Sequence, residues 1–111
     1  MNVTSFCGKE TIVEHTPYCA SKFSATAITQ SLAKELAAFN VNVNAVCPGI
    51  VRTRTWDGLA DTQWDMQVKR VPLQRGQTVE DIGEAAAFLA SDRAITITGV
   101  SLGVTGGLSI W

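Results

Sequence analysis

The chain has 111 residues, of which 46% are hydrophobic and 17% charged, and its formal net charge is -1. This length allows one domain or less, and the composition is typical of a folded α/β protein rather than a disordered one. The near-neutral charge, without a basic block, gives no support to nucleic-acid binding. No apolar run approaches the roughly 20 residues of a membrane span, and no signal peptide is visible, so we expect no membrane association.

The first half of the chain predicts the end of a strand, a polar loop and one long helix. Residues 1–5 are the strand end, and the loop follows. Thr16 and Pro17 are typical of a helix start, with threonine as the N-cap, and we expect a helix from Pro17 to Phe39. Its expected buried stripe follows the apolar repeat Ile28, Leu32 and Leu36, widened by Phe23, Ala25, Ala33 and Phe39. Asn40 suits the left-handed conformation that ends a helix.

The second half predicts two strands and two further helices. Apolar and polar residues roughly alternate from Val41 to Cys47, and the asparagines there need partners if the strand is internal. Residues 61–70 form a short helix, and a capping box at residues 78–81 opens a helix through Ala90. The last strand is Val100 to Val104. This order predicts a parallel sheet with right-handed crossovers.

The three cysteines indicate reduced thiols in a cytoplasmic protein. Their number is odd, and Cys7, Cys19 and Cys47 lack C-x-x-C spacing, which argues against a disulfide framework or a metal site. His15 is expected to be a loop histidine without a metal or a catalytic partner. We also expect a surface ion pair between Arg75 and Glu80 or Asp81, of small energetic value.

The most informative pair is Tyr18 and Lys22, four residues apart at the start of the long helix. This spacing puts both side chains on one helix face. A cation beside a phenol favours the phenolate, and such a phenol can exchange a proton with a substrate oxygen. Alone, the pattern is more often an exposed tyrosine and a solvated lysine. Ser5 upstream and Pro48-Gly49 after the next strand favour a proton-transfer site.

In this order the residues resemble the short-chain dehydrogenase/reductase family, over nearly the whole chain. The matching stretches are Asn2 to Ser5, Tyr18 to Lys22, Ser31 to Leu36, Val41 to Gly49, Glu80 to Ile82, Phe88 to Ser91, and the ending Thr98 to Gly107. The resemblance is to the C-terminal half of a classical member. It implies an α/β fold over residues 1–111: part of a doubly wound Rossmann-type parallel sheet, with about three strands and two to three helices.

The resemblance also implies an NAD- or NADP-dependent oxidoreductase that transfers a hydride between the nicotinamide and a ketone or secondary alcohol. The residue matching Tyr18 is the acid/base, the one matching Lys22 holds the nicotinamide ribose, and the one matching Ser5 hydrogen-bonds the substrate oxygen. The implied cofactor contacts are Tyr18, Lys22, Pro48, Gly49, Val51 and Thr53. The family's dimers use the helix matching Pro17 to Phe39, which implies a homo-oligomer.

Two features leave other interpretations open. The sequence has no G-x-x-x-G-x-G loop to hold a pyrophosphate, so a truncated, non-catalytic paralogue that associates with full-length relatives through the long helix is the alternative, and a partial gene product is a third. The segment after Thr53 matches the family's variable substrate lid. Its Trp56 and Trp64 are equally compatible with a pocket wall and with plain packing.

Overall fold

The computed structural model describes all 111 residues and contains one parallel sheet of three strands. The strands are β1 (Asn2–Val3), β2 (Ala45–Pro48) and β3 (Ser101–Val104), in the order β1-β2-β3. Val46 pairs with Val3 on one side and with Leu102 on the other. The expected partial Rossmann-type sheet is therefore confirmed.

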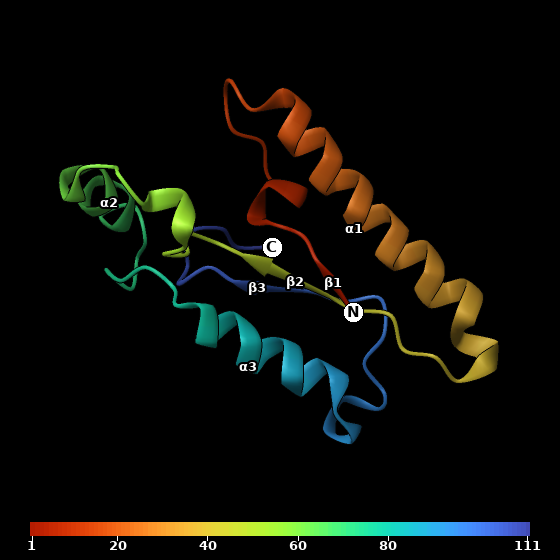
Figure 1. Cartoon of the computed structure of the whole chain (residues 1–111). Helices are drawn as coiled ribbons and strands as arrows, with labels where there is room; N and C mark the ends of the chain where they lie inside the picture. The colour runs from red at the N-terminus through yellow and green to blue at the C-terminus, as the bar shows by residue number, and fades with distance from the viewer.

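Three helices connect and flank these strands. They are α1 (Thr16–Leu36), α2 (Asp61–Val68) and α3 (Val79–Ala90). The sheet lies between α1 and α3, and α2 lies beyond the carboxyl end of β2 (Figure 1). Because both crossovers move the same way along the sheet but use opposite faces, they have opposite hands. The expectation of right-handed crossovers is therefore wrong for one of them. None of the helices combines the length and the hydrophobicity that a membrane crossing requires.

Helix α1 confirms the predicted stripe in part, since Ala33 is buried and Ala25, Leu32 and Leu36 are half-buried. Its buried residues are Cys19, Thr26, Thr29 and Ala33. Ile28 is 52% exposed, and Phe23 and Phe39 are exposed as well. Threonine can lie on the inner face because its hydroxyl is satisfied within the helix. Thr29 Oγ1 donates to the Ala25 carbonyl at 2.8 Å.

The ends of α1 are partly as expected. Thr16 is the first helical residue rather than the N-cap, a position that His15 occupies without a side-chain hydrogen bond. Residues Ala37–Phe39 continue as a 3-10 turn, and Asn40 follows with a φ of 57°, the left-handed conformation predicted for it. The start was misplaced because Thr-Pro fits both the cap and the first turn.

Strand β2 is shorter than its alternating pattern predicted. The stretch before Ala45 keeps two backbone bonds, from the Asn2 N–H to the Asn44 carbonyl at 2.8 Å and from the Gly99 N–H to the Val43 carbonyl at 2.7 Å. Side chains add to them: Asn44 Nδ2 donates to the Ile97 carbonyl at 2.7 Å, and Asn44 Oδ1 accepts from the Val100 N–H at 3.1 Å. Asn42 Nδ2 donates to the Ile95 carbonyl at 2.8 Å. Both asparagines thus have hydrogen-bond partners, although only Asn44 is buried and requires them.

Helix α3 follows the sequence closely. Thr78 and Asp81 form the predicted capping box, and Leu89 is buried while Ile82, Ala85 and Ala86 are half-buried. The ion pair expected from Arg75 does not form, since Arg52–Asp61, at 3.2 Å, is the only salt bridge in the chain. Asp81 instead accepts a hydrogen bond from the Thr78 backbone N–H at 2.8 Å.

The contact that positions α1 is made by the 3-10 turn Phe6–Gly8, which α1 contacts more than any other element. A Cβ at Gly8 would lie 2.8 Å from both the Lys22 carbonyl oxygen and Thr26 Oγ1. Only a residue without a side chain allows this approach. Ser5 precedes the turn and Tyr18 lies on the helix, so this contact sets the spacing between them.

Replacing Gly8 with alanine is expected to lower the free energy of unfolding by about 1–3 kcal/mol, because the new methyl group overpacks the turn against α1. Gly83→Ala is the matched control, since a Cβ at Gly83 meets nothing within 4 Å. It should stabilise α3 by about 0.5–1 kcal/mol. Urea unfolding of the purified chain measures both, and equal stability of Gly8→Ala and wild type would contradict the packing described.

The capping box predicts a specific acid response. The Thr78 backbone N–H lowers the pKa of the Asp81 carboxyl below its ordinary value of 3.8. A depressed pKa stabilises the fold above the unfolded value, roughly pH 4, and this contribution is lost as the pH falls through the folded value. Asp81→Asn should therefore show a shallower fall in melting temperature than wild type below about pH 4. Parallel melting curves across that range would contradict this assignment.

Candidate active site

A cavity of about 470 Å³ lies at the carboxyl ends of β1 and β2. Its lining residues come from these strand ends, the first turn of α1, the loop after β2 and the start of α3. They include Ser5, Tyr18, Pro48, Gly49, Val51 and Thr53, so the structure brings together every site residue predicted from the sequence except Lys22. Carboxyl ends of parallel strands are where α/β folds bind ligands.

Ser5 is held rigidly at the end of β1. It is 6% exposed, and its Oγ accepts a hydrogen bond from the Cys7 backbone N–H at 3.1 Å. This bond caps the 3-10 turn and uses the hydroxyl only as an acceptor. The Ser5 O–H can therefore still be turned to donate to a group in the cavity.

Tyr18 and Lys22 share one face of α1, as the sequence predicts. The Lys22 ammonium lies 5.6 Å from the centre of the Tyr18 ring. Tyr18 is 45% exposed and lines the cavity, whereas Lys22 is half-buried and lies behind it. Lys22 therefore places a positive charge beside the Tyr18 ring without lining the cavity itself.

The loop after β2 is fixed by close backbone contacts. The Gly49 N–H donates to the Val104 carbonyl at 3.0 Å. A Cβ at Gly49 would lie 2.7 Å from Gln77 Oε1 and 2.9 Å from Thr105 Cα, so no larger residue fits. Thr53 Oγ1 is 2.8 Å from Thr55 Oγ1, which places two hydroxyls at the cavity wall.

Some cavity residues escaped the sequence analysis. Thr4, Thr55, Val79 and Ile82 also line it. Gln77, which is 6% exposed, supports the loop from below through a backbone bridge with Val51. Its Oε1 is buried without a partner. Nothing in the local pattern marks these positions, because their role depends on how α3 meets the end of β2.

The two tryptophans of the lid differ in role. Trp56 lines the cavity, and its indole N–H donates to the Val51 carbonyl at 3.0 Å. Trp64 packs edge-on against Trp56, with ring centres 5.0 Å apart, and lies below the Arg52 guanidinium. Trp56 is thus a pocket wall, and Trp64 is packing that supports it.

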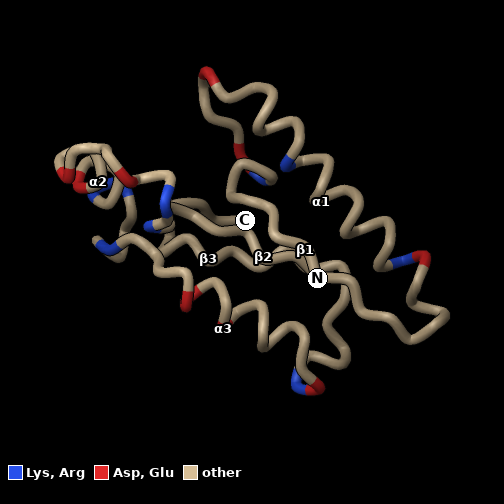
Figure 2. Tube along the Cα trace, viewed as in Figure 1, with Lys and Arg blue, Asp and Glu red and all other residues tan.

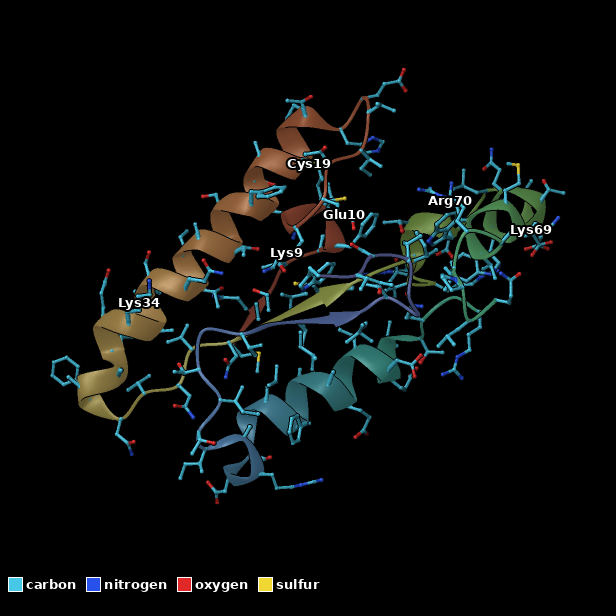
Figure 3. The ribbon with its side chains drawn as sticks, turned by 180° about the vertical axis from the view of Figure 1, so that it is seen from behind. Lys9, Glu10, Cys19, Lys34, Lys69 and Arg70 are labelled. Atoms are coloured by element: carbon cyan, nitrogen blue, oxygen red, sulfur yellow. The ribbon has the colours of Figure 1, made fainter.

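The three cysteines are free and buried. Cys7 and Cys19 lie where the 3-10 turn meets α1, next to the cavity, and Figure 3 shows Cys19 on the side of α1 that faces this turn. Burial raises the pKa of the Cys7 thiol, although the hydrogen bond with Ser5 opposes this. A neutral, buried thiol is a poor nucleophile, so Cys7 is a packing residue.

Comparison with known proteins identifies the family. The family described as enoyl-(acyl carrier protein) reductase matches residues 1–109. Nodulation protein G of Rhizobium sp. (strain N33) is 36% identical over 110 residues, which are 99% of this chain and 45% of that protein. The 3-oxoacyl-(acyl-carrier-protein) reductase of Haemophilus influenzae is 42% identical over 108 residues, 97% of this chain and 45% of that protein.

Solved structures agree. A protein from Agrobacterium tumefaciens described as a 2-deoxy-D-gluconate 3-dehydrogenase, with bound NADP, superposes with a TM-score of 0.89 at 33% identity, over 96% of this chain and 44% of that one. Sorbitol-6-phosphate 2-dehydrogenase from Erwinia amylovora gives a TM-score of 0.87 at 30% identity, over 98% of this chain and 47% of that one.

The chain therefore belongs to the short-chain dehydrogenase/reductase family of oxidoreductases. It spans less than half the length of the relatives it matches. The cofactor expected from the sequence, NAD or NADP, agrees with the NADP bound in the first of these structures.

The burial of the thiols makes a prediction. Cys7, Cys19 and Cys47 are at most 3% exposed, so the folded chain should react very slowly with Ellman's reagent and release three thiols per chain in guanidinium. Ser24→Cys, at an exposed position of α1, is the positive control and should react at once. Reaction of the wild-type thiols as fast as this control would mean that the 3-10 turn does not cover α1.

Proposed function

We propose that residues 1–111 are the C-terminal part of an NAD(P)-binding domain and carry the acid/base side of a site that interconverts a ketone and a secondary alcohol. The main support is the one cavity that gathers the Ser5, Tyr18 and Thr53 side chains beside the Pro48-Gly49 turn. The named relatives include acyl-carrier-protein reductases and dehydrogenases of sugar derivatives, which support the reaction class but select no substrate.

The cavity suits a nicotinamide. Its volume, about 470 Å³, falls in the usual range for small ligands, and its walls combine apolar groups such as Ile50 and Val51 with a few hydroxyls. We assign the cofactor contacts to Tyr18, Lys22, Pro48, Gly49, Val51 and Thr53. When bound, the nicotinamide supplies or accepts the hydride.

The chain's own residues then manage the proton and the charge. The O–H of Ser5 donates to the substrate oxygen, on which negative charge develops as a ketone is reduced. Tyr18 Oη gives that oxygen its proton, or removes it in the reverse reaction. The Lys22 ammonium, 5.6 Å from the ring, stabilises the negative charge left on the phenol.

A second function, association with longer relatives, is favoured by the surfaces that the chain leaves uncovered. β1 pairs only with β2, and Val3 is 60% exposed. Such an open edge accepts another strand. On α1, the half-exposed Ile28 is a second uncovered apolar position. We propose that these surfaces bind a longer family member, or a second copy through the helix from Pro17 to Phe39, in the cytoplasm, where the three thiols stay reduced.

The test of the catalytic proposal begins with fluorescence titration of the purified chain with NADH and NADPH, followed by assay of small ketones. Tyr18→Phe should keep cofactor binding and slow turnover by about 100- to 10,000-fold, because the ring remains and the proton donor is lost. Ser24→Ala, outside the cavity, is the control.

A chain that folds but binds neither cofactor would refute the catalytic proposal for these residues. Mixing with a full-length relative then decides the second function. A stable complex by light scattering would support it, and independent elution of the two chains would reject it.

A further inference from the structure

A second cavity, of about 790 Å³, opens on the other side of Tyr18. It shares six lining residues with the first cavity: Ser5, Tyr18, Gly49, Ile50, Thr55 and Trp56. It contains none of Pro48, Val51 and Thr53, which line only the first. The two cavities therefore meet at the Ser5 and Tyr18 side chains, and if the first takes the nicotinamide, the second takes the substrate.

The walls of this second cavity are mainly apolar near Tyr18 and charged at its far side. Phe6, Ile12 and Val13 come from the segment before α1, while Gln67 and Arg70 come from α2 and the turn after it. Arg70 is the only lysine or arginine among the lining residues. Charged residues gather around α2, whereas the strands carry none (Figure 2).

Arg70 is exposed and hydrogen-bonded to a neighbouring side chain, but no carboxylate neutralises it. Its Nη1 donates to Gln67 Oε1 at 2.7 Å, and it makes no salt bridge, because the one salt bridge of the chain is Arg52–Asp61. An amide oxygen orients a guanidinium but brings no negative charge, so the remaining N–H donors stay available. In Figure 3, Arg70 lies nearer the sheet than its neighbour Lys69.

Glu14 also lines this cavity, but from the loop before α1, and it forms no ion pair with Arg70. The exposed carboxylate of Glu14 repels an anion near this loop, whereas Arg70 attracts one near α2.

We propose that the substrate is a small carbonyl or alcohol compound with a carboxylate or phosphate remote from the reacting carbon, and that Arg70, oriented by Gln67, binds this anionic group. The proposal rests on the function proposed above. The apolar lining residues Phe6, Ile12 and Val13 suit the carbon skeleton that joins the two groups, and the guanidinium fork can donate to two oxygens of a carboxylate or a phosphate.

The test compares matched ligands that differ in charge. The probes are 4-oxopentanoate with its methyl ester, and dihydroxyacetone phosphate with dihydroxyacetone, and binding to the purified chain is measured by isothermal titration calorimetry. The anionic member of at least one pair should bind about tenfold or more tightly than its neutral partner, as expected for a charge-assisted hydrogen bond. The pair with the larger ratio distinguishes carboxylate from phosphate.

Arg70→Gln should remove this difference in affinity. Arg70→Lys should retain only part of it, because lysine keeps the positive charge but lacks the forked N–H donors of the guanidinium. Lys69→Gln removes a neighbouring cation that does not line the cavity and should leave the ratio unchanged. Equal loss in Arg70→Gln and Lys69→Gln, equal affinity of anionic and neutral probes, or no binding of any probe would overturn the proposal. The readout is independent of turnover, so a failure of the catalytic proposal leaves the charge comparison intact.

Discussion

The structure depends most on the close contact between Gly8 and the backbone of α1. Without a side chain at this position, the 3-10 turn comes within reach of the Lys22 carbonyl and the Thr26 hydroxyl. Ser5 caps that turn through its own Oγ, and Tyr18 lies one helical turn before Lys22. One backbone contact thereby fixes two hydroxyls that belong to different elements at the same cavity.

The rest of the fold positions the other walls of the site. β2 is buried on both sides, and side chains of Asn42 and Asn44 hold the segment that leads into it. The turn after β2 is tight because Gly49 fits between Gln77 and Thr105. This arrangement lets the loop carry Thr53 and Trp56 over the cavity while the strand below remains rigid.

The sequence predicted correctly those structural features that depend only on residues close together in the chain. The capping box of α3, the left-handed Asn40 and the shared face of Tyr18 and Lys22 each follow from a few adjacent residues. The inner face of α1 was predicted only in part, because hydrophobicity alone ranks Ile28 above Thr29, whereas Thr29 is buried with its hydroxyl bonded to the helix backbone. Gln77 and Arg70 were missed because only the tertiary fold places Gln77 under the loop after β2 and Arg70 at the second cavity.

The central claim is that these residues form one cavity for a nicotinamide next to Tyr18. Its most direct test is an NMR titration of the ¹⁵N-labelled chain with NADPH, following each backbone amide. The account predicts saturable shifts at Ser5, Tyr18, Gly49 and Thr53, with little change at Lys34 and Gly99 at the opposite end of the sheet. Shifts spread evenly over the chain, or none at the cavity residues, would contradict it.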